Sequence, residues 1–144
     1  MTKSATTLPV HPDREPELRT IAMPADTNSA GDIFGGWLLG QMDIAGGMHA
    51  AQQVLGRVTT VGIEAMSFDR PVFVGDRVSC YCDTTRVGRT SLTVHVETWV
   101  RRRSDQAGFE DIKVTEGQLT FVALNPDGSK RIIPEDAPAR RQTH

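Results

Sequence analysis

Hydrophobic and polar positions divide the chain near Gly56 into a part with helical spacing and a part with the two-residue period of strands. Between about Gly35 and Val54, apolar residues recur at steps of three and four with few charges between them, which predicts one long helix. Because apolar residues point almost all round this helix, we expect it to be buried. A weaker alternation over 17–23 predicts a short strand, and the Pro-, Asn- and Gly-containing segment 24–32 predicts a loop.

Four long strands are predicted after the helix. The alternating segments are 58–68, 76–86, 90–103 and 113–125, with a polar loop expected over 104–111. The alternation is clearest in the third strand, where one face is expected to be buried and the other partly wet. The residues of the expected buried face are Leu92, Val94, Val96, Thr98 and Val100.

A long buried helix followed by a meander of strands indicates an α+β fold, in which an antiparallel β-sheet wraps around one long central helix. A sheet curled around a single helix leaves an edge and part of a face open, so we expect a homodimer or a higher homo-oligomer. The folded domain is expected over 17–133. The segments 1–16 and 134–144, rich in Pro and charged residues, are expected to be mobile tails.

Composition and charge argue against nucleic-acid and membrane partners. A chain of 144 residues is one domain by length, and a net charge of −2 lacks the basic excess of a dedicated nucleic-acid binder. The sequence shows neither a signal-peptide core nor a run of the about 20 apolar residues that a membrane span needs. Cys80 and Cys82 lie two apart in a strand and are poorly placed to bridge each other. We therefore expect a cytoplasmic protein with no nucleic-acid or membrane partner.

One carboxylate, Asp43, stands within the apolar helix and raises the question of its role. It either pairs inside the core or at a subunit contact, or acts as a general base or nucleophile in dry surroundings. The nearby Gly40, Gly46 and Gly47 each disfavour a helix by about 1 kcal/mol relative to Ala. We expect another helix or a ligand to approach the backbone there.

The glycines at the start of the helix are a second candidate element. The segment Gly31–Gly36 is either a plain N-terminal turn or a source of free amides that bind an oxyanion or a polarised carbonyl. Seven residues separate Gly36 from Asp43, which is about 10 Å of axial rise. The amides and the carboxylate of one helix cannot both reach one carbonyl group. If both act, the site must combine two chains.

Other catalytic patterns receive less support. The sequence has no GxSxG motif and no His near either cysteine, so a nucleophile–histidine triad is not expected. The histidines have no metal-ligand spacing, and His49 is interpreted as a structural residue. No metal or other cofactor is expected.

Two arginine-containing segments follow. The hairpin Arg86–Ser91, with two arginines, a glycine and two hydroxyls, would suit phosphate oxygens. The run Arg101–Arg103 is interpreted as a solvated strand end, which is the usual role of such a charge run.

With these residues in view, the chain resembles the hotdog-fold acyl-CoA thioesterases of the YciA type. The matching motifs occur in order over about 20–134, and this coverage makes the resemblance specific. They are Ala22–Asn28, Gly31–Trp37, Gln41–Asp43, Gly56–Val58, Phe68–Pro71, Val74–Asp76, Val87–Ser91, Glu97–Val100 and Thr120–Ala123.

The resemblance implies a hydrolase that cleaves acyl-CoA thioesters with water and works as a dimer, often assembled as a trimer of dimers. It implies that Asp43 is the general base or nucleophile and that Asn28, contributed across the dimer, orients water or substrate. The amides of Gly35 and Gly36 would polarise the thioester carbonyl. Carried over on the same basis, Arg89, Thr90 and Ser91 would hold the CoA moiety, which is part of the substrate.

Two alternatives remain from the sequence. A hotdog-fold enoyl-CoA hydratase or dehydratase would need a dyad containing His, and no His lies near the helix start. A non-catalytic acyl-CoA sensor that controls transcription would need a DNA-binding module. Only about 16 residues precede the expected domain, too few for a helix-turn-helix.

Overall fold

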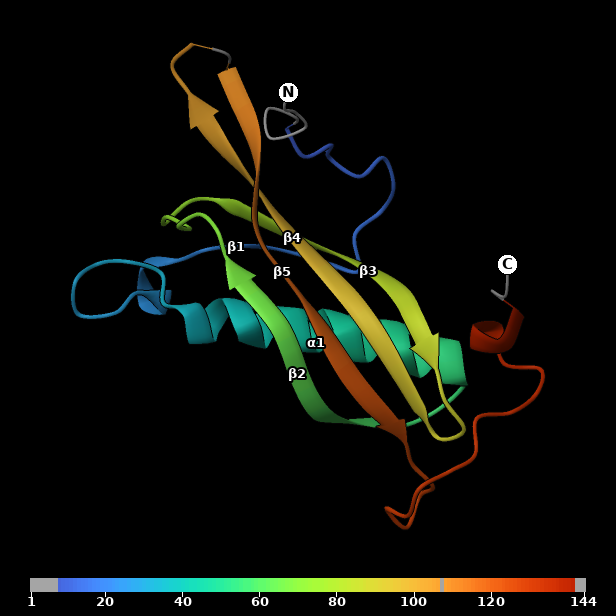
Figure 1. Ribbon diagram of the computed structural model, residues 1–144. Coiled ribbons are helices and arrows are strands. Elements are labelled where there is room, and N and C mark those ends of the chain that lie inside the picture. Colours follow the sequence, from blue (N-terminus) through green and yellow to red (C-terminus); the bar gives the residue numbers. More distant parts are fainter. Residues whose placement is uncertain (1–7, 107, 142–144) are drawn as a thin grey trace.

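One long helix packs against a curled antiparallel sheet in the computed structural model, which describes residues 8–106 and 108–141 (Figure 1). The strands follow the order β1-β3-β4-β5-β2, and every neighbouring pair is antiparallel. The expected α+β hotdog fold is confirmed. The elements are β1 (Leu18–Ile21), η2 (Pro24–Asp26), α1 (Gly35–Val54), β2 (Val58–Phe68), β3 (Arg77–Val87), β4 (Ser91–Ser104), β5 (Gly108–Ala123) and η3 (Pro138–Arg141).

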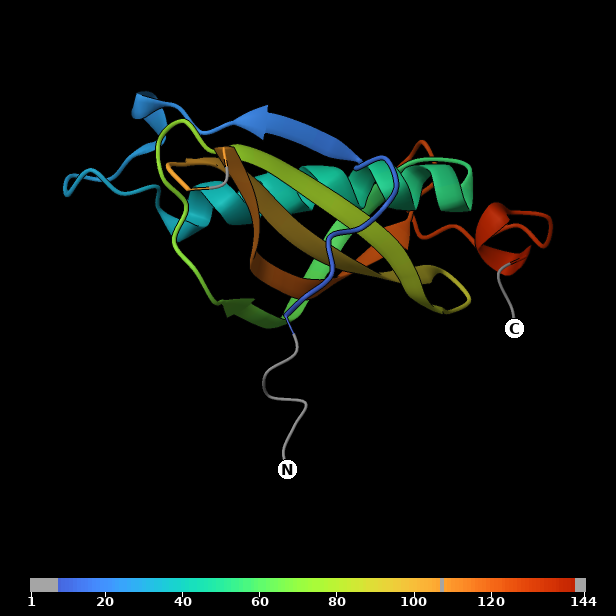
Figure 2. The same ribbon diagram turned by 90° about the horizontal axis from the view of Figure 1, so that it is seen from above.

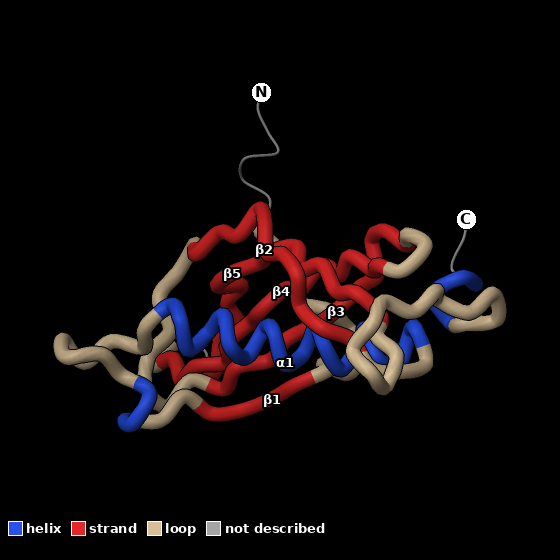
Figure 3. Tube along the Cα trace, turned by 90° about the horizontal axis from the view of Figure 1, so that it is seen from below, coloured by secondary structure: helices blue, strands red, loops and turns tan. Residues whose placement is uncertain are grey.

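The helix α1 has the predicted bounds but is buried on one side only. It ends where Leu55 adopts the left-handed conformation at φ 58° and the Gly56 amide donates to the Ala51 carbonyl at 3.0 Å. Ile44 and Met48 are 55% and 54% exposed. The expectation of a fully buried helix is therefore wrong for the single chain, because the sheet covers one face and leaves the other open (Figure 3). The buried face consists of Leu38, Met42, Ala45, Gly46, Ala50 and Val54.

The helix glycines have different surroundings. A Cβ atom at Gly46 would lie 3.0 Å from Cζ of Phe121, so a side chain of the sheet, not a second helix or a ligand, approaches the backbone there. At Gly40 an added Cβ atom would have no neighbour within 4 Å. A close approach therefore occurs at Gly46, but the expectation of a helix or a ligand there is wrong within the single chain, and Gly40 faces open space.

The outer face of the sheet is partly covered by the segment that precedes β1. The predicted inner face of β4 is confirmed as buried. On the outer face, the ring of Trp99 is only 3% exposed and lies 4.9 Å from the ring of His11. Arg14 forms an ion pair with Asp83 at 2.8 Å. Figure 2 shows this N-terminal segment lying across β3, so its described part contacts the domain.

The C-terminal segment also contacts the core. Ala137 and Ala139 are 0% and 1% exposed, and Arg140 donates to the carbonyl of Ile133 at 3.2 Å. Packing therefore continues beyond residue 133, where the sequence predicts that the domain ends. The small alanines fit against the end of α1, although the charged composition around them suggested a tail.

The strands β4 and β5 form a longer hairpin than the sequence predicts. Ser104 pairs with Gly108, so most of the expected loop over 104–111 is strand. The guanidinium of Arg101 donates to both carboxylate oxygens of Asp111, at 2.8 and 2.9 Å. This cross-strand pair extends the sheet through a segment whose polar composition suggested a loop.

The central arginine of the Arg101–Arg103 run is not solvated. Arg102 donates from Nη2 to Asp76 Oδ2 at 2.6 Å and from Nε to Asp76 Oδ1 at 3.0 Å. Asp76 is only 3% exposed, and it also accepts a bond from the Phe73 amide at 2.8 Å. The interpretation of this run as a solvated strand end is wrong for Arg102, because strand alternation turns it toward a buried carboxylate.

Candidate active site

Asp43 lies on the open side of α1, next to the edge strand β2. Its Oδ1 atom accepts a hydrogen bond from Thr60 Oγ1 at 2.6 Å. The residue is half-buried. Because the neighbouring Ile44 is exposed on the same part of α1, the described residues alone do not complete the dry surroundings expected for this carboxylate.

The start of α1 leaves two backbone donors free. The amides of Trp37 and Leu38 both point to the carbonyl of Phe34, at 3.1 and 3.5 Å. Within the part of the chain that the structure describes, the amides of Gly35 and Gly36 have no acceptor. Together with the helix dipole, they suit a carbonyl oxygen that gains negative charge.

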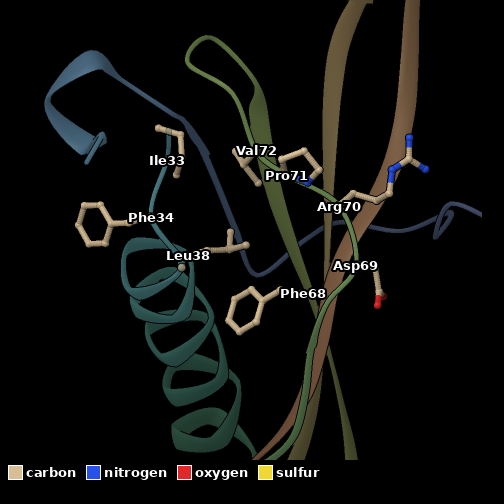
Figure 4. A pocket seen from close by; sticks show the side chains of 9 residues that line it. Ile33, Phe34, Leu38, Phe68, Asp69, Arg70, Pro71 and Val72 are labelled. Atoms are coloured by element: carbon tan, nitrogen blue, oxygen red, sulfur yellow. The ribbon is translucent and has the colours of Figure 1, made fainter. Parts of the chain in front are cut away.

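A pocket of about 260 Å³ opens beside these amides. A Cβ atom at Gly35 would lie 3.6 Å from Cε1 of Phe68, so the first turn of α1 and the end of β2 form adjoining walls. Figure 4 shows Leu38 and Phe68 beside the first helix turn, whereas the charged ends of Asp69 and Arg70 point away from it. The lining residues are Ile33, Phe34, Gly35, Leu38, Phe68, Asp69, Arg70, Pro71 and Val72.

The sequence singled out the Gly31–Gly36 side of this pocket but indicated no role for the facing wall, residues Phe68–Val72. The signal was present in Phe68–Pro71, which belongs to the motifs that carry the family resemblance. Its position was missed because strand periodicity does not show where a strand end meets a distant helix start. Thr60, the partner of Asp43, was missed for the same reason.

Asn28 lies in the exposed loop that leads into α1. Its Oδ1 atom accepts hydrogen bonds from the amides of Ala30 and Asp32, at 2.9 and 3.1 Å. Its Nδ2 atom has no partner among the residues that the structure describes. The side chain therefore shapes the loop with its oxygen and keeps its nitrogen free to donate.

The hairpin residues Arg89, Thr90 and Ser91 lie far from the helix start in the same chain. Figure 1 places the β3–β4 turn beside the C-terminal end of α1, and a helix of 20 residues is about 30 Å long. The carbonyls of Arg89 and Thr90 accept bonds from Ile133 and Ala123, at 2.9 and 2.8 Å. The backbone holds the turn, while the Arg89 side chain stays exposed.

The other chemically reactive side chains have structural surroundings. Nε2 of His49 lies 2.9 Å from Thr84 Oγ1, and burial lowers the pKa of His49, which agrees with the structural role expected for it. Cys80 and Cys82 are free and buried, and burial raises the pKa of Cys80 to about 11. Over residues 8–106 and 108–141, no group of three or more His, Cys, Asp or Glu residues could hold a metal ion.

No helix in these same ranges combines the length and apolarity needed to cross a membrane.

Comparison with known proteins identifies the family. The model of the thioesterase superfamily matches residues 30–105. The acyl-CoA thioester hydrolase YciA of Salmonella typhimurium is 47% identical over 129 residues, which are 90% of this chain and 97% of that protein.

Two solved structures share the fold. The hexameric hotdog-fold thioesterase Cj0915 of Campylobacter jejuni is 43% identical with a TM-score of 0.82, covering 85% of this chain and 92% of that one. The hexameric broad-specificity acyl-coenzyme A thioesterase HI0827 is 44% identical with a TM-score of 0.81. The match covers 88% of this chain and 86% of that one. By its sequence motifs, its fold and these relatives, the chain belongs to the thioesterase superfamily.

Proposed function

We propose that the protein hydrolyses acyl-CoA thioesters to a free fatty acid and CoA, in a site shared by two subunits. The observation that carries the proposal is the arrangement along α1. Within the described part of the chain the amides of Gly35 and Gly36 have no acceptor, Gly35 lines a largely apolar pocket, and Asp43 lies two turns further on. Relatives that are 43–47% identical and bear the names of acyl-CoA hydrolases or thioesterases support it.

Thioester hydrolysis needs a polarised carbonyl group and an activated nucleophile. The Gly35 and Gly36 amides would donate to the thioester carbonyl oxygen and stabilise its negative charge during addition. Asp43 would take a proton from the attacking water, or would itself attack the carbonyl carbon to form an anhydride that water then opens. In either case the C–S bond breaks, and the CoA sulfur leaves as a thiolate that takes up a proton. Asn28 would orient water or substrate through its free Nδ2.

A second copy of the chain would complete the site. Gly36 and Asp43 are about 10 Å apart along one helix, too far to act on the same carbonyl. Two helices packed antiparallel about a two-fold axis would bring the Gly36 amide of one chain to Asp43 of the other. The exposed apolar residues on this side of the chain support such packing. They are Phe34, Ile44, Met48, Val61 and Ile63.

The same packing would bring the hairpin Arg89–Ser91 of one chain toward the helix start of the other, where it could hold the CoA moiety. The named structural relatives are hexamers, so we propose that three such dimers assemble here as well. Free buried cysteines suit the reducing cytoplasm in which we place the enzyme.

Thiol release from a panel of short, medium and long acyl-CoAs tests the activity. Wild type should release thiol, and Asp43→Asn should lower turnover by about 10²–10⁴-fold with the oligomer intact. Glu135→Gln is the matched control, because Glu135 is an exposed carboxylate in the C-terminal segment. Full activity of a folded Asp43→Asn variant would exclude the catalytic role, and hydration of enoyl-CoA without thiol release would favour a hydratase.

Subunit mixing tests the shared site. Inactive Asp43→Asn and Asn28→Ala proteins are unfolded together and refolded. If Asp43 and Asn28 act from different chains, each mixed dimer regains one intact site. If both act from the same chain, every site in the mixture stays defective.

A further inference from the structure

Three arginines gather on the outer face of the sheet, where β1, β3 and β4 lie side by side (Figure 1). Arg77 on β3 and Arg101 on β4 are direct partners in the strand register. Arg19 on β1 donates from Nε to Ser79 Oγ at 2.9 Å. Because Ser79 is two residues from Arg77 on the same strand, all three guanidinium groups share one face.

Among the described residues, the arginine cluster (Arg19, Arg77 and Arg101) takes part in a single ion pair. Asp111 pairs with Arg101 alone, at 2.8 Å. Among the residues that the structure describes, Arg77 has no ion-pair or hydrogen-bond partner, and its Nε atom is buried. Burial, then the neighbouring charges of Arg19 and Arg101, lower the pKa of Arg77, while the nearby Asp111 acts in the opposite direction. Like charges directly opposite each other destabilise a sheet, so the cluster favours the arrival of an anion.

We propose that Arg19, Arg77 and Arg101 form a binding site for a phosphate group. Arg77 can offer its planar fork to two phosphate oxygens. Arg19 and Arg101 already donate from Nε to Ser79 and Asp111, so they can offer their remaining terminal nitrogens. Asp111 is paired with Arg101 and offsets one of the three positive charges. The site therefore suits a single phosphate group, either free or as a monoester.

This site is distinct from the proposed thioester site. Val78 and Val100 alternate with Arg77 and Arg101 along their strands, and both pack in the same inner cluster as Leu38 of α1. The arginines consequently face away from the helix, with the sheet between them and the pocket at the helix start. A ligand bound there would not compete directly for that pocket.

The full-length protein is titrated with inorganic phosphate and with phenyl phosphate, against chloride at equal ionic strength, and binding is followed by calorimetry and by Tm. Arg77→Gln should weaken phosphate binding about tenfold or more, since it removes a charged donor. The same variant should raise Tm in phosphate-free buffer, because it removes like-charge repulsion. Arg57→Gln is the control, since Arg57 is an exposed arginine beside β2 whose side chain donates to the Pro126 carbonyl.

Equal binding of both probes supports a site that takes phosphate monoesters, and binding of free phosphate alone supports a site closed to esters. Absence of phosphate binding to wild type, or equal binding to wild type and Arg77→Gln, would overturn the proposal. A change of oligomer mass in Arg77→Gln without any effect of phosphate would overturn it as well, because the cluster would then face carboxylates of a second copy.

Discussion

Thr60 of β2 donates a hydrogen bond of 2.6 Å to the carboxylate of Asp43 on α1. The bond joins the helix to the edge strand of the sheet, and it occupies one of the two carboxylate oxygens. The other oxygen has no hydrogen-bond partner among the described residues. We therefore propose that Thr60 is a positioning residue, which orients the proposed base.

Loss of this hydroxyl should lower activity and leave the fold intact. In Thr60→Val the side chain keeps its shape but no longer donates, so the carboxylate can rotate away from the attacking water. We expect kcat to fall about tenfold, the effect of losing roughly one charged hydrogen bond, with KM little changed. Thr60→Ser retains the hydroxyl and should restore most of kcat. Equal activity of the Val and Ser variants would contradict the positioning role.

The two polar ends of the Asn28 side chain can be separated by mutation. Asn28→Asp keeps an oxygen for the amides of Ala30 and Asp32 but replaces the free donor by an acceptor. We expect the loop and Tm to be preserved and kcat to fall about 10²-fold, as when one positioned donor is removed from an active site. Asn28→Ala should lose both the loop contact and the activity. An active Asn28→Asp enzyme would mean that Asn28 serves the loop alone.

Element boundaries followed from local sequence to a large extent. The bounds of α1 and β2 were predicted to the residue, because glycines flank the helix and strand alternation begins directly after Gly56. The start of β5 was not predicted, since polar residues over 104–111 hide a hairpin that the pairing of Arg101 with Asp111 extends. The composition of a short segment does not show that a residue ten positions away will pair with it.

The candidate site was only half visible in the sequence. Asp43 and the helix-start glycines stood out because a charge and small residues are unusual in a helix. Thr60 and Phe68 did not, because their importance depends on how β2 crosses α1. Among the described residues the most buried acidic residue is Asp76 and not Asp43, because Asp43 lies on the open face of α1.

Gly40 should mark the crossing point of two helices in the proposed dimer. The midpoint between Gly36 and Asp43 falls between Leu39 and Gly40, and an added Cβ atom at Gly40 would meet nothing within 4 Å in the single chain. Gly40→Ala should be tolerated, because Ala favours the helix by about 1 kcal/mol and adds one carbon. Gly40→Leu should separate the helices, so that native mass and thioesterase activity are lost together. Light scattering and thiol release measure both.

The control for Gly40→Leu is Gln52→Leu, which adds a similar side chain at an exposed position of α1. It should keep both mass and activity. A Gly40→Leu protein of native mass and activity would show that the helices do not cross at this residue.

The ion pair between Arg102 of β4 and Asp76, which directly precedes β3, should contribute strongly to the free energy of unfolding. Arg102→Met leaves the carboxylate of Asp76, which is 3% exposed, without its cation. We expect the free energy of unfolding to fall by about 3–5 kcal/mol, the usual consequence of breaking a buried pair. In the double variant Arg102→Met/Asp76→Asn the buried charge is gone and the amide oxygen can still accept the bond from Phe73, so much of the loss should be recovered. Urea unfolding of the single and double variants provides the measurement, and a double variant no more stable than Arg102→Met would show that the buried charge is not the cause.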